Sequence, residues 1–397
     1  MNLKAIFTKK LITPVGTGPL RGKNMNDVKV MENVYIVFDE KIRDITKDAP
    51  GVNVLAQASL VTPGFVDCHT HIPFHGFRDG EFVMRSQGKS YVEILKAGGG
   101  IHSTVSKVRG ASLEDLISFN EPFLLEMLKK GVTTVEGKSG YGLQIEAELK
   151  QLKALKKLSE SLPISIAITF LGAHAIPKGI TPQGYLKSLV ENFDKVREFT
   201  DTIDIFVDEG AFSIEDARGY LEKARQDGFR LRLHADEIKR TGAALLGVEL
   251  GAISVDHLLK ITEDDIEILA RSDTAAVMMP ATSFYLGEDY GPARELIDNG
   301  AIVALGSDFN PGSNTISDPT LIMHLAVSKL RLTPQEALTA FTLNSAHVLG
   351  ASHTVGSIQP GKSADMVAWK VPTLEAIPYL PSHSIVDFVV KGGQIVS

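Results

Sequence analysis

The sequence predicts a (β/α)8 barrel joined to a small β-sandwich domain that both ends of the chain build together. Over residues 62–354, apolar β-rich runs alternate with helical stretches, and several runs are apolar at nearly every position, as strands buried on both faces should be. Outside that region the chain is β-like and rich in turns. The eight predicted barrel strands cover residues 60–67, 132–136, 164–171, 203–207, 231–233, 252–255, 275–279 and 301–305.

A doubly wound open sheet is the competing architecture for alternating strands and helices. Such sheets usually carry a glycine-rich phosphate-binding turn after a strand, and no predicted strand is followed by one. Helix signals also fit the barrel. Ser112-Leu-Glu-Asp115 and Thr262-Glu-Asp-Asp265 are capping boxes that predict helix starts, and Pro163 predicts the end of a helix over residues 149–158.

The two ends of the chain are expected to fold together. Residues 4–7, 28–38, 52–60, 365–369 and 385–390 are β-like runs, and Gly392-Gly393 predicts a tight turn into a last short strand. Neither end alone has enough apolar surface for a core. The prediction is therefore one discontinuous small domain, residues 1–61 with 355–397, beside the barrel of residues 62–354.

Composition narrows the range of functions and partners. The chain has 397 residues, 22% of them charged, with a net charge of −7, so it has no basic field that would attract nucleic acid or a membrane surface. The first residues lack the long apolar core of a signal peptide. Cys68 is the single cysteine, which excludes an internal disulfide and fits a reducing compartment. The cytoplasm is the expected location.

The first predicted barrel strand ends in two histidines separated by one residue, His69 and His71. Side chains alternate along a strand, so both imidazoles should project to the same side and could hold two positions of a metal ion. Each histidine alone could equally satisfy a local hydrogen bond. However, five of the eleven histidines fall at ends of predicted strands, which favours a shared site. The five are His69, His71, His174, His234 and His257.

Barrel closure predicts which of these residues meet. The first and eighth strands become neighbours, so Asp308 should reach a metal held by His69 and His71, and His234 should come across the mouth as a fourth ligand. Two-metal barrels of this kind usually carry a carboxylated lysine at the end of the fourth strand. The fourth strand here runs into Asp208 and has no lysine, so one divalent ion is expected. Imidazole and carboxylate ligands suit both Zn and Fe, so the sequence does not decide which of the two metals is bound.

With these residues in place, the chain resembles the amidohydrolase superfamily, and within it the branch that opens the imidazolone ring formed in histidine degradation. The resemblance extends over most of the barrel. The sequence motifs on which it rests are Pro63-Gly-Phe-Val-Asp-Cys-His-Thr-His71, Gly98-Gly-Gly-Ile101, Ser103-Thr-Val105, Glu136-Gly-Lys-Ser-Gly-Tyr-Gly-Leu143, Thr169-Phe-Leu-Gly-Ala-His-Ala175, His234-Ala-Asp-Glu237, Asp256-His-Leu258 and Asp308-Phe-Asn-Pro-Gly-Ser313.

This resemblance implies hydrolysis of 4-imidazolone-5-propanoate to N-formimino-L-glutamate by a hydroxide on a single metal ion. The residue types fit that chemistry. Glu237, three residues beyond His234, could shuttle a proton, and His257 could stabilise charge on the carbonyl oxygen. Asp308 could act first as a ligand and then as a proton acceptor from the water.

The anionic heterocyclic substrate needs donors for its carboxylate. Arg78 offers a planar fork, and Tyr91, Tyr141 and His174 are further candidates, with Glu237 also able to bond a ring nitrogen. For Arg78 a surface salt bridge is an equally good reading of the sequence alone. The polar groups beyond the eighth strand could bind the edge of the ring; these are Asn310, Gly312 and Ser313.

Three departures from the family pattern and two other functions stay open. His75, Gly137 and Ser307 differ from the residues usual at these positions, and His75 is the one expected to affect substrate range.

A deaminase or another cyclic amidase with the same metal set, and a scaffold without catalysis, are the alternative functions. A homodimer is expected because such barrels often leave apolar helices uncovered.

Overall fold

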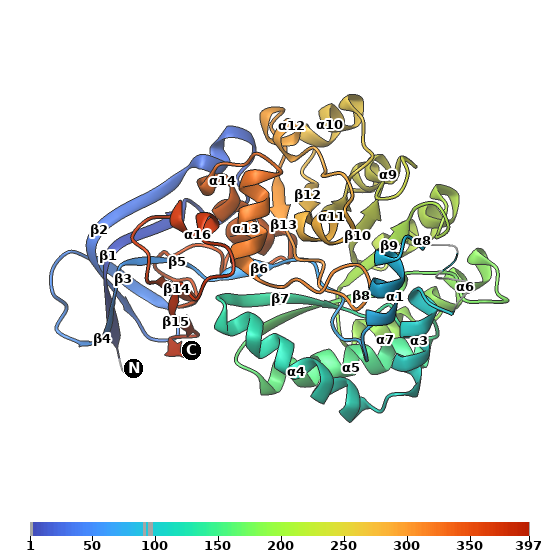
Figure 1. The fold of residues 1–397 in the computed structure, drawn as a ribbon, viewed down its shortest axis with the longest axis horizontal. Helices are drawn as coiled ribbons and strands as arrows, with labels where there is room; N and C mark the ends of the chain where they lie inside the picture. The colour runs from blue at the N-terminus through green and yellow to red at the C-terminus, as the bar shows by residue number, and fades with distance from the viewer. Residues whose placement is uncertain (1–2, 90–92, 94–97, 397) are drawn as a thin grey trace.

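A computed structural model describes residues 3–89, 93 and 98–396. Figure 1 shows a barrel with helices around it and a smaller β-rich part at one side, where the chain ends lie close together. The fold class is the one that the sequence predicts.

The barrel consists of eight parallel strands whose order along the sheet follows their order in the chain. Each of its internal neighbours is paired in parallel register, for example His234 opposite Asp256. Many of their apolar side chains belong to the large apolar core, together with side chains of the surrounding helices. They are β6 (Phe65–Asp67), β7 (Val132–Lys138), β8 (Ser165–Ala173), β9 (Thr202–Val207), β10 (Arg230–Ala235), β11 (Ser254–His257), β12 (Ala275–Met278) and β13 (Val303–Leu305).

The first and last barrel strands meet through the segments that follow them. The backbone N–H of Asp308 donates to the carbonyl of His69 at 2.8 Å, and the N–H of His71 donates to the carbonyl of Phe309 at 2.9 Å. The residues after β6 and after β13 are therefore held side by side at the carboxyl ends of the strands.

Helices pack around the strands, and three described helices lie in the long connection between β6 and β7 (Figure 1). Both predicted capping boxes are present, at Ser112 with Asp115 and at Thr262 with Asp265. The helices are α1 (Asp79–Ser86), α3 (Ile101–Gly110), α4 (Leu113–Lys129), α5 (Ile145–Ser161), α6 (Pro182–Val190), α7 (Phe193–Arg197), α8 (Ile214–Gln226), α9 (Ala243–Leu250), α10 (Glu263–Ala270), α11 (Pro280–Leu286), α12 (Ala293–Asp298), α13 (Pro319–Ser328), α14 (Pro334–Thr339), α15 (Ser345–Val348) and α16 (Ala376–Tyr379), with a 3-10 turn η1 (Gly22–Asn26) and a π-helical turn η2 (Ala340–Asn344).

Strands from both ends of the chain combine as predicted, and they are hydrogen-bonded as one mixed sheet. Its apolar side chains form a core cluster of their own. The predicted glycine turn connects the last two strands. The strands are β1 (Lys4–Pro14), β2 (Val28–Phe38), β3 (Ile42–Thr46), β4 (Asn53–Ala58), β5 (Leu60–Pro63), β14 (Met366–Trp369), β15 (Val386–Lys391) and β16 (Gln394–Ile395).

The predicted first barrel strand, residues 60–67, is two strands in the structure. β5 belongs to the terminal sheet, where it pairs with β14, and only β6 belongs to the barrel. Gly64 separates them, and a Cβ there would collide with the side chain of Thr133. The chain changes sheets at a residue whose missing side chain allows this close approach.

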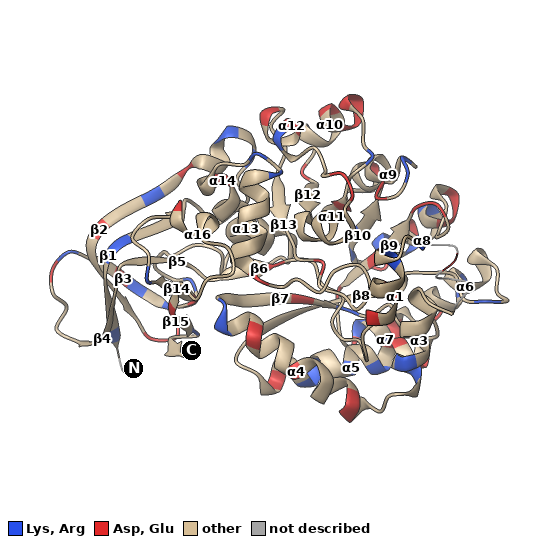
Figure 2. Ribbon diagram, in the orientation of Figure 1, with Lys and Arg blue, Asp and Glu red and all other residues tan. Residues whose placement is uncertain are grey.

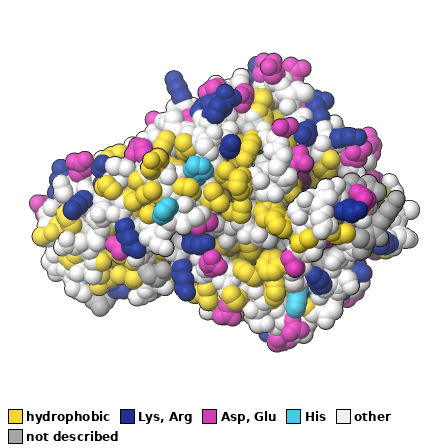
Figure 3. Space-filling model, viewed as in Figure 1, with side chains coloured by type: hydrophobic (Ala, Val, Ile, Leu, Met, Phe, Trp, Pro, Cys, Tyr) yellow, Lys and Arg dark blue, Asp and Glu magenta, His cyan; other side chains and the backbone are white. Residues whose placement is uncertain are grey.

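Charges of both signs are interspersed along many of the helices and loops (Figure 2). Apolar side chains gather along the middle of the face in Figure 3. None of the helices among the described residues has both the length and the apolar character needed to span a bilayer.

Candidate metal centre and active site

Three buried histidines converge at the carboxyl ends of the barrel strands. His69 and His71 follow β6, and His234 lies in β10. One ring nitrogen from each lies within 4.8 Å of the other two. The structure thus brings together the three imidazoles that the sequence analysis assigned to a metal ion.

The hydrogen bonds of two of these histidines leave the same nitrogen free. The Nδ1 atom of His69 lies 2.7 Å from Asp256, and the Nδ1 atom of His234 lies 3.2 Å from Asp204. A carboxylate at Nδ1 fixes the proton there and leaves the Nε2 lone pair available. Burial would raise the pKa of Asp204, but His234 and Lys138 hold it well below its usual range.

The Nε2 atoms of His69, His71 and His234 lie close together, an arrangement that suits a bound cation. The buried Nε2 of His69 has no hydrogen-bond partner among the described residues, and the Nε2 atoms of His71 and His234 are 3.3 Å apart. A buried ring nitrogen whose lone pair has no partner, as at Nε2 of His69, is costly. The donor set therefore fits a metal ion held by imidazole nitrogens.

Asp308 supplies a carboxylate to the same centre. Its Oδ1 lies 3.2 Å from Nε2 of His71 and 3.7 Å from Nε2 of His69, while the hydroxyl of Thr282 donates to Oδ2 at 2.7 Å. Burial alone would raise the pKa of Asp308, but its interactions with His71 outweigh that effect and lower the pKa to about 2. The side chain is thus an acceptor throughout the neutral range.

Glu237 and His257 form a pair beside this centre. Nδ1 of His257 lies 3.5 Å from Oε1 of Glu237, and the ring of His257 is 5.1 Å from that of His234. Burial, with the negative charge of Asp308 as a second cause, raises the pKa of Glu237 to about 8. A carboxyl group with such a pKa can give and accept a proton near neutral pH.

Asp208 fixes the loop that carries Glu237. Its two carboxylate oxygens accept from the backbone N–H groups of Glu237, Ile238 and Lys239 at 2.8, 2.8 and 3.0 Å. The predicted fourth-strand carboxylate is therefore a support for the fifth-strand loop, and it orients Glu237 without facing the metal centre itself.

Aromatic donors line one side of the centre. The ring of His174 stacks on that of His71, with centroids 4.9 Å apart and planes at 19°. The buried Tyr141 lies 5.3 Å from His174 and 6.0 Å from His71 between ring centroids. Burial raises the pKa of the Tyr141 hydroxyl, so that group stays a proton donor.

Arg78 packs on the loop after β13. A Cβ added at Gly312 would overlap the guanidinium of Arg78, so the arginine occupies the space that a larger residue at this position would fill. The backbone N–H of Arg78 also donates to the carbonyl of Pro311 at 3.1 Å. Its side chain is 13% exposed, and its Nε lies 3.5 Å from Glu81. Arg78 is thus a largely buried side chain that is ion-paired with Glu81.

The side chain of Asn310 shapes the same loop. Its Oδ1 accepts from the N–H groups of Gly312 and Ser313 at 2.9 and 2.7 Å, and its Nδ2 donates to the carbonyl of Asp308 at 2.7 Å. Asn310 thus holds the turn on which Arg78 packs. Tyr91 lies outside the described residues.

The sequence model of the amidohydrolase family matches residues 60–396. The chain belongs to the amidohydrolase family. Among curated proteins, an imidazolonepropionase of Kosmotoga olearia is 48% identical over 391 residues, 98% of this chain and 96% of that protein. An imidazolonepropionase of Staphylococcus aureus is 41% identical over 395 residues, with 98% and 95% of the two chains covered.

Solved structures support the fold at low identity. An adenosine deaminase from Xanthomonas campestris with bound zinc has a TM-score of 0.74 at 18% identity, covering 99% of this chain and 92% of that one. Guanine deaminase of E. coli has a TM-score of 0.73 at 16% identity, covering 100% and 99%. These likenesses concern the amidohydrolase fold alone.

Two of the unusual residues of this amidohydrolase have structural explanations. His75 stacks on Phe119 of α4, with ring centroids 5.1 Å apart and planes at 12°. A Cβ at Gly137 would overlap Leu155 of α5 and approach the carbonyl of Ile72 to 3.1 Å. His75 thus packs against a flanking helix, and Gly137 lets α5 lie close to β7.

Sequence reasoning missed Asp204 and Arg232, two charged side chains inside this amidohydrolase's barrel. Both are completely buried. Arg232 lies two residues before His234, and Asp204 lies four residues before Asp208. The available signal was the alternation itself: in Arg230-Leu-Arg-Leu-His234 the charged Arg232 shares a face with His234.

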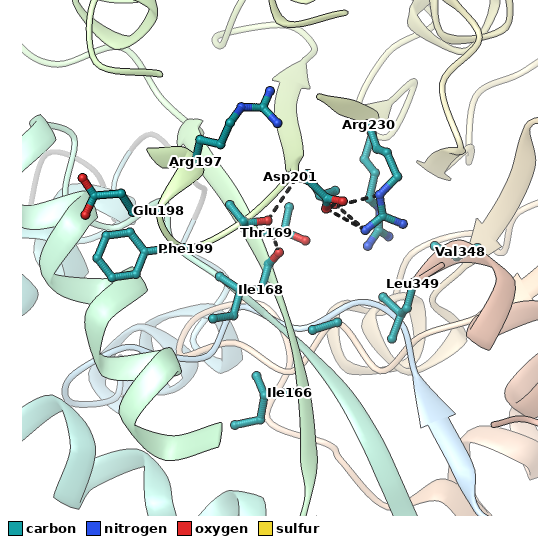
Figure 4. Close-up of a pocket in the computed structure, with 14 residues that line it drawn as sticks. Ile166, Ile168, Thr169, Arg197, Glu198, Phe199, Asp201, Arg230, Val348 and Leu349 are labelled. Carbon is teal, nitrogen blue, oxygen red and sulfur yellow. Dashed lines mark hydrogen bonds and ion pairs between the residues drawn. The ribbon is translucent and has the colours of Figure 1, made fainter. Parts of the chain in front are cut away.

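A separate cavity of roughly 490 Å³ lies toward the amino ends of β8, β9 and β10 (Figure 4). Its lining includes Ile166, Thr200 and Leu349, and its Arg230 already donates to Asp201 at 2.9 Å. Functional sites of such barrels lie at the opposite, carboxyl end of the strands. The cavity is therefore distinct from the metal centre.

From the three converging imidazoles we expect about one divalent ion per chain. Replacing His234 by Ala should reduce the ion retained after dialysis to a small fraction, because three imidazoles are needed to hold it. Elemental analysis of the purified protein measures this. The matched control is His324→Ala, because His324 bonds the carbonyl of Pro378 on α16 instead. Equal metal content in the His234 and His324 variants would contradict the site.

Proposed function

We propose that this chain is a hydrolase that opens 4-imidazolone-5-propanoate to N-formimino-L-glutamate in histidine degradation. The observation that carries the proposal is the largely buried guanidinium of Arg78, which packs on the loop that follows Asp308. It offers a carboxylate-binding fork at the rim of a metal centre. The near full-length identity to two curated imidazolonepropionases supports the same substrate.

The proposed cofactor is one Zn or Fe ion held by His69, His71, His234 and Asp308. When bound, such an ion supplies a nucleophile at neutral pH by lowering the pKa of water from about 15.7 toward 7. The chain itself orients these ligands through Asp256, Asp204 and Thr282, as described above.

Hydrolysis breaks the ring's amide C–N bond, adds the oxygen of water to the carbonyl carbon and returns a proton to the departing nitrogen. Asp308 accepts a proton from the attacking water. Glu237 donates a proton to the ring nitrogen and then takes up the proton held by Asp308, so both groups return to their starting state. His257, held by Glu237, stabilises the charge that develops on the carbonyl oxygen.

The substrate's propanoate is proposed to lie against Arg78, with Tyr141, His174 and Tyr91 as further donors. Among the residues beyond β13, Ser313 and the backbone at Gly312 are proposed to meet the ring edge. Asn310 serves the substrate through the shape of its loop, since its own side chain is bonded within that loop.

Several broader expectations accompany this function. Residues 1–61 with 355–397 are proposed as one domain and residues 62–354 as the other. The enzyme is proposed to act in the cytoplasm as a homodimer. Its partner is a small anionic heterocycle, and neither nucleic acid nor a membrane is expected to bind.

A substrate panel tests the function against its nearest rival. Purified metal-loaded protein should turn over the imidazolone and leave cytosine, guanine and hydantoins unchanged, because a neutral base offers no carboxylate to Arg78. Turnover is followed by absorbance and product analysis. Activity only on a neutral base would replace the proposal with a deaminase, and metal-loaded protein inactive on all four would favour a scaffold.

Replacing Glu237 by Gln should keep the metal and lower kcat by about 10²-fold or more, the usual scale for a general acid–base group. Metal analysis and steady-state kinetics measure the two effects. Glu209→Gln is the matched control, because Glu209 is an exposed carboxylate that pairs with Lys239. Full activity in the Glu237 variant would exclude the proton-transfer role.

Replacing Arg78 by Met should raise KM for the imidazolone by about 10- to 100-fold, because a charge-assisted fork to a carboxylate contributes roughly 1.5–3 kcal/mol. Gly312→Ala should raise KM in the same direction, since its Cβ displaces the guanidinium. The control is Gly219→Ala in α8, where no atom lies within 4 Å of the added Cβ and φ is not positive. An unchanged KM in both Arg78 and Gly312 variants would exclude the clamp.

A further inference from the structure

A series of hydrogen bonds and ion pairs joins His69 to His234 through the interior of the barrel, and a metal ion held by both histidines would close it into a ring. His69 bonds Asp256, and Asp256 lies 2.6 Å from Arg232. Arg232 pairs with Glu136. The ring then returns along the other side: Glu136 lies 2.6 Å from Lys138, Lys138 lies 3.0 Å from Asp204, and Asp204 bonds His234.

All five charged members of this ring have fully buried side chains. A barrel interior is usually filled by apolar branched side chains, and a buried ion pair is often no more stable than an apolar replacement. Stability therefore does not account for the ring. Three carboxylates and two cations leave one net negative charge beside the metal centre, which suits a bound cation.

Glu136 occupies the one position where the two arms of the ring join. Its Oε1 receives Arg232 and the hydroxyl of Thr169, the latter at 2.5 Å, and its Oε2 faces Lys138. Among the described residues its carboxylate contacts these three side chains, and its backbone carbonyl accepts from the hydroxyl of Thr70 at 2.6 Å. Its carboxylate therefore reaches the Nδ1 atoms of the histidines through other members of the ring, and a change of the side chain alone leaves the bond to Thr70 in place.

We propose that Glu136 is a positioning residue for the metal centre, which holds Arg232 and Lys138 so that Asp256 and Asp204 keep two imidazoles turned with Nε2 toward the ion. The inference rests on the proposed metal-dependent function, but it concerns metal binding and not the substrate. Residues that orient the ligands of a metal ion typically change its affinity by about 10- to 100-fold when they are replaced.

The test is Glu136→Gln, which keeps the shape of the side chain and removes the charge that both cations share. The dissociation constant for Zn²⁺ is measured by competition with a chelating dye, and the Co²⁺-loaded protein gives a visible spectrum that reports ligand geometry. The expected result is a Zn²⁺ dissociation constant about 10- to 100-fold higher and an altered Co²⁺ spectrum. KM for the imidazolone should stay the same at saturating metal.

The matched control is Glu148→Gln. Glu148 is equally buried and lies in α5, where it accepts the N–H groups of Gly142 and Leu143 at 2.8 and 2.7 Å. Its replacement should leave the Zn²⁺ dissociation constant and the Co²⁺ spectrum as in the parent. Equal weakening in both variants would mean that any buried charge near β7 matters, and would overturn the proposal.

A milder variant covers the case in which Glu136→Gln does not fold. Thr169→Val removes only the hydroxyl that donates to Glu136 and should weaken Zn²⁺ binding in the same direction by a smaller factor. Unchanged metal affinity in the folded Glu136 variant, or in the Thr169 variant if only that one folds, would overturn the role. Loss of metal affinity without turnover of imidazolone in the parent would instead reject the proposed function and leave this inference standing.

Discussion

The site depends on the closure of the barrel between its first and last strands. The histidines after β6 and the aspartate after β13 are about 240 positions apart in the chain, yet the bond from the N–H of Asp308 to the carbonyl of His69 makes them neighbours. Asp67 strengthens the same junction, since it accepts the N–H of Ser307 at 2.8 Å. A carboxylate thus reaches the metal centre only because the sheet closes on itself.

Closure fixes the position of the ligands, and the barrel interior fixes their orientation. Side chains two residues apart in a strand share a face, so Arg232 lies beneath His234 and Asp204 lies opposite on the neighbouring strand. Charges at such depth are stable only when each is paired. The same ion pairs place Asp256 at Nδ1 of His69 and Asp204 at Nδ1 of His234. One set of contacts therefore pairs the buried charges and also orients two imidazoles of the histidine cluster.

The sequence predicts the ends of strands better than their interiors. An apolar run that stops at His69 or Asp308 is visible in one dimension, and the rule that strand ends of a barrel share a rim brings such residues together. Asp204 and Arg232 were hidden because each stands inside a run that reads as apolar. The split at Gly64 and the packing of Arg78 on Gly312 depend on contacts between distant segments. No local pattern predicts either of them.

The backbone at the rim is itself held in a rare conformation. His257, Leu258 and Asp308 have φ angles of 79°, 61° and 55°, a region that residues other than glycine seldom adopt and that costs of order 1–3 kcal/mol each. Specific bonds maintain it, such as that from the N–H of Leu258 to the carbonyl of Ala235 at 3.1 Å. A strand that continued straight would carry alternate side chains up and away from the mouth. The left-handed residues end these strands abruptly, and His257 and Asp308 lie beside the histidine cluster where they do so. Local backbone strain thus accompanies the convergence of side chains from separate strands.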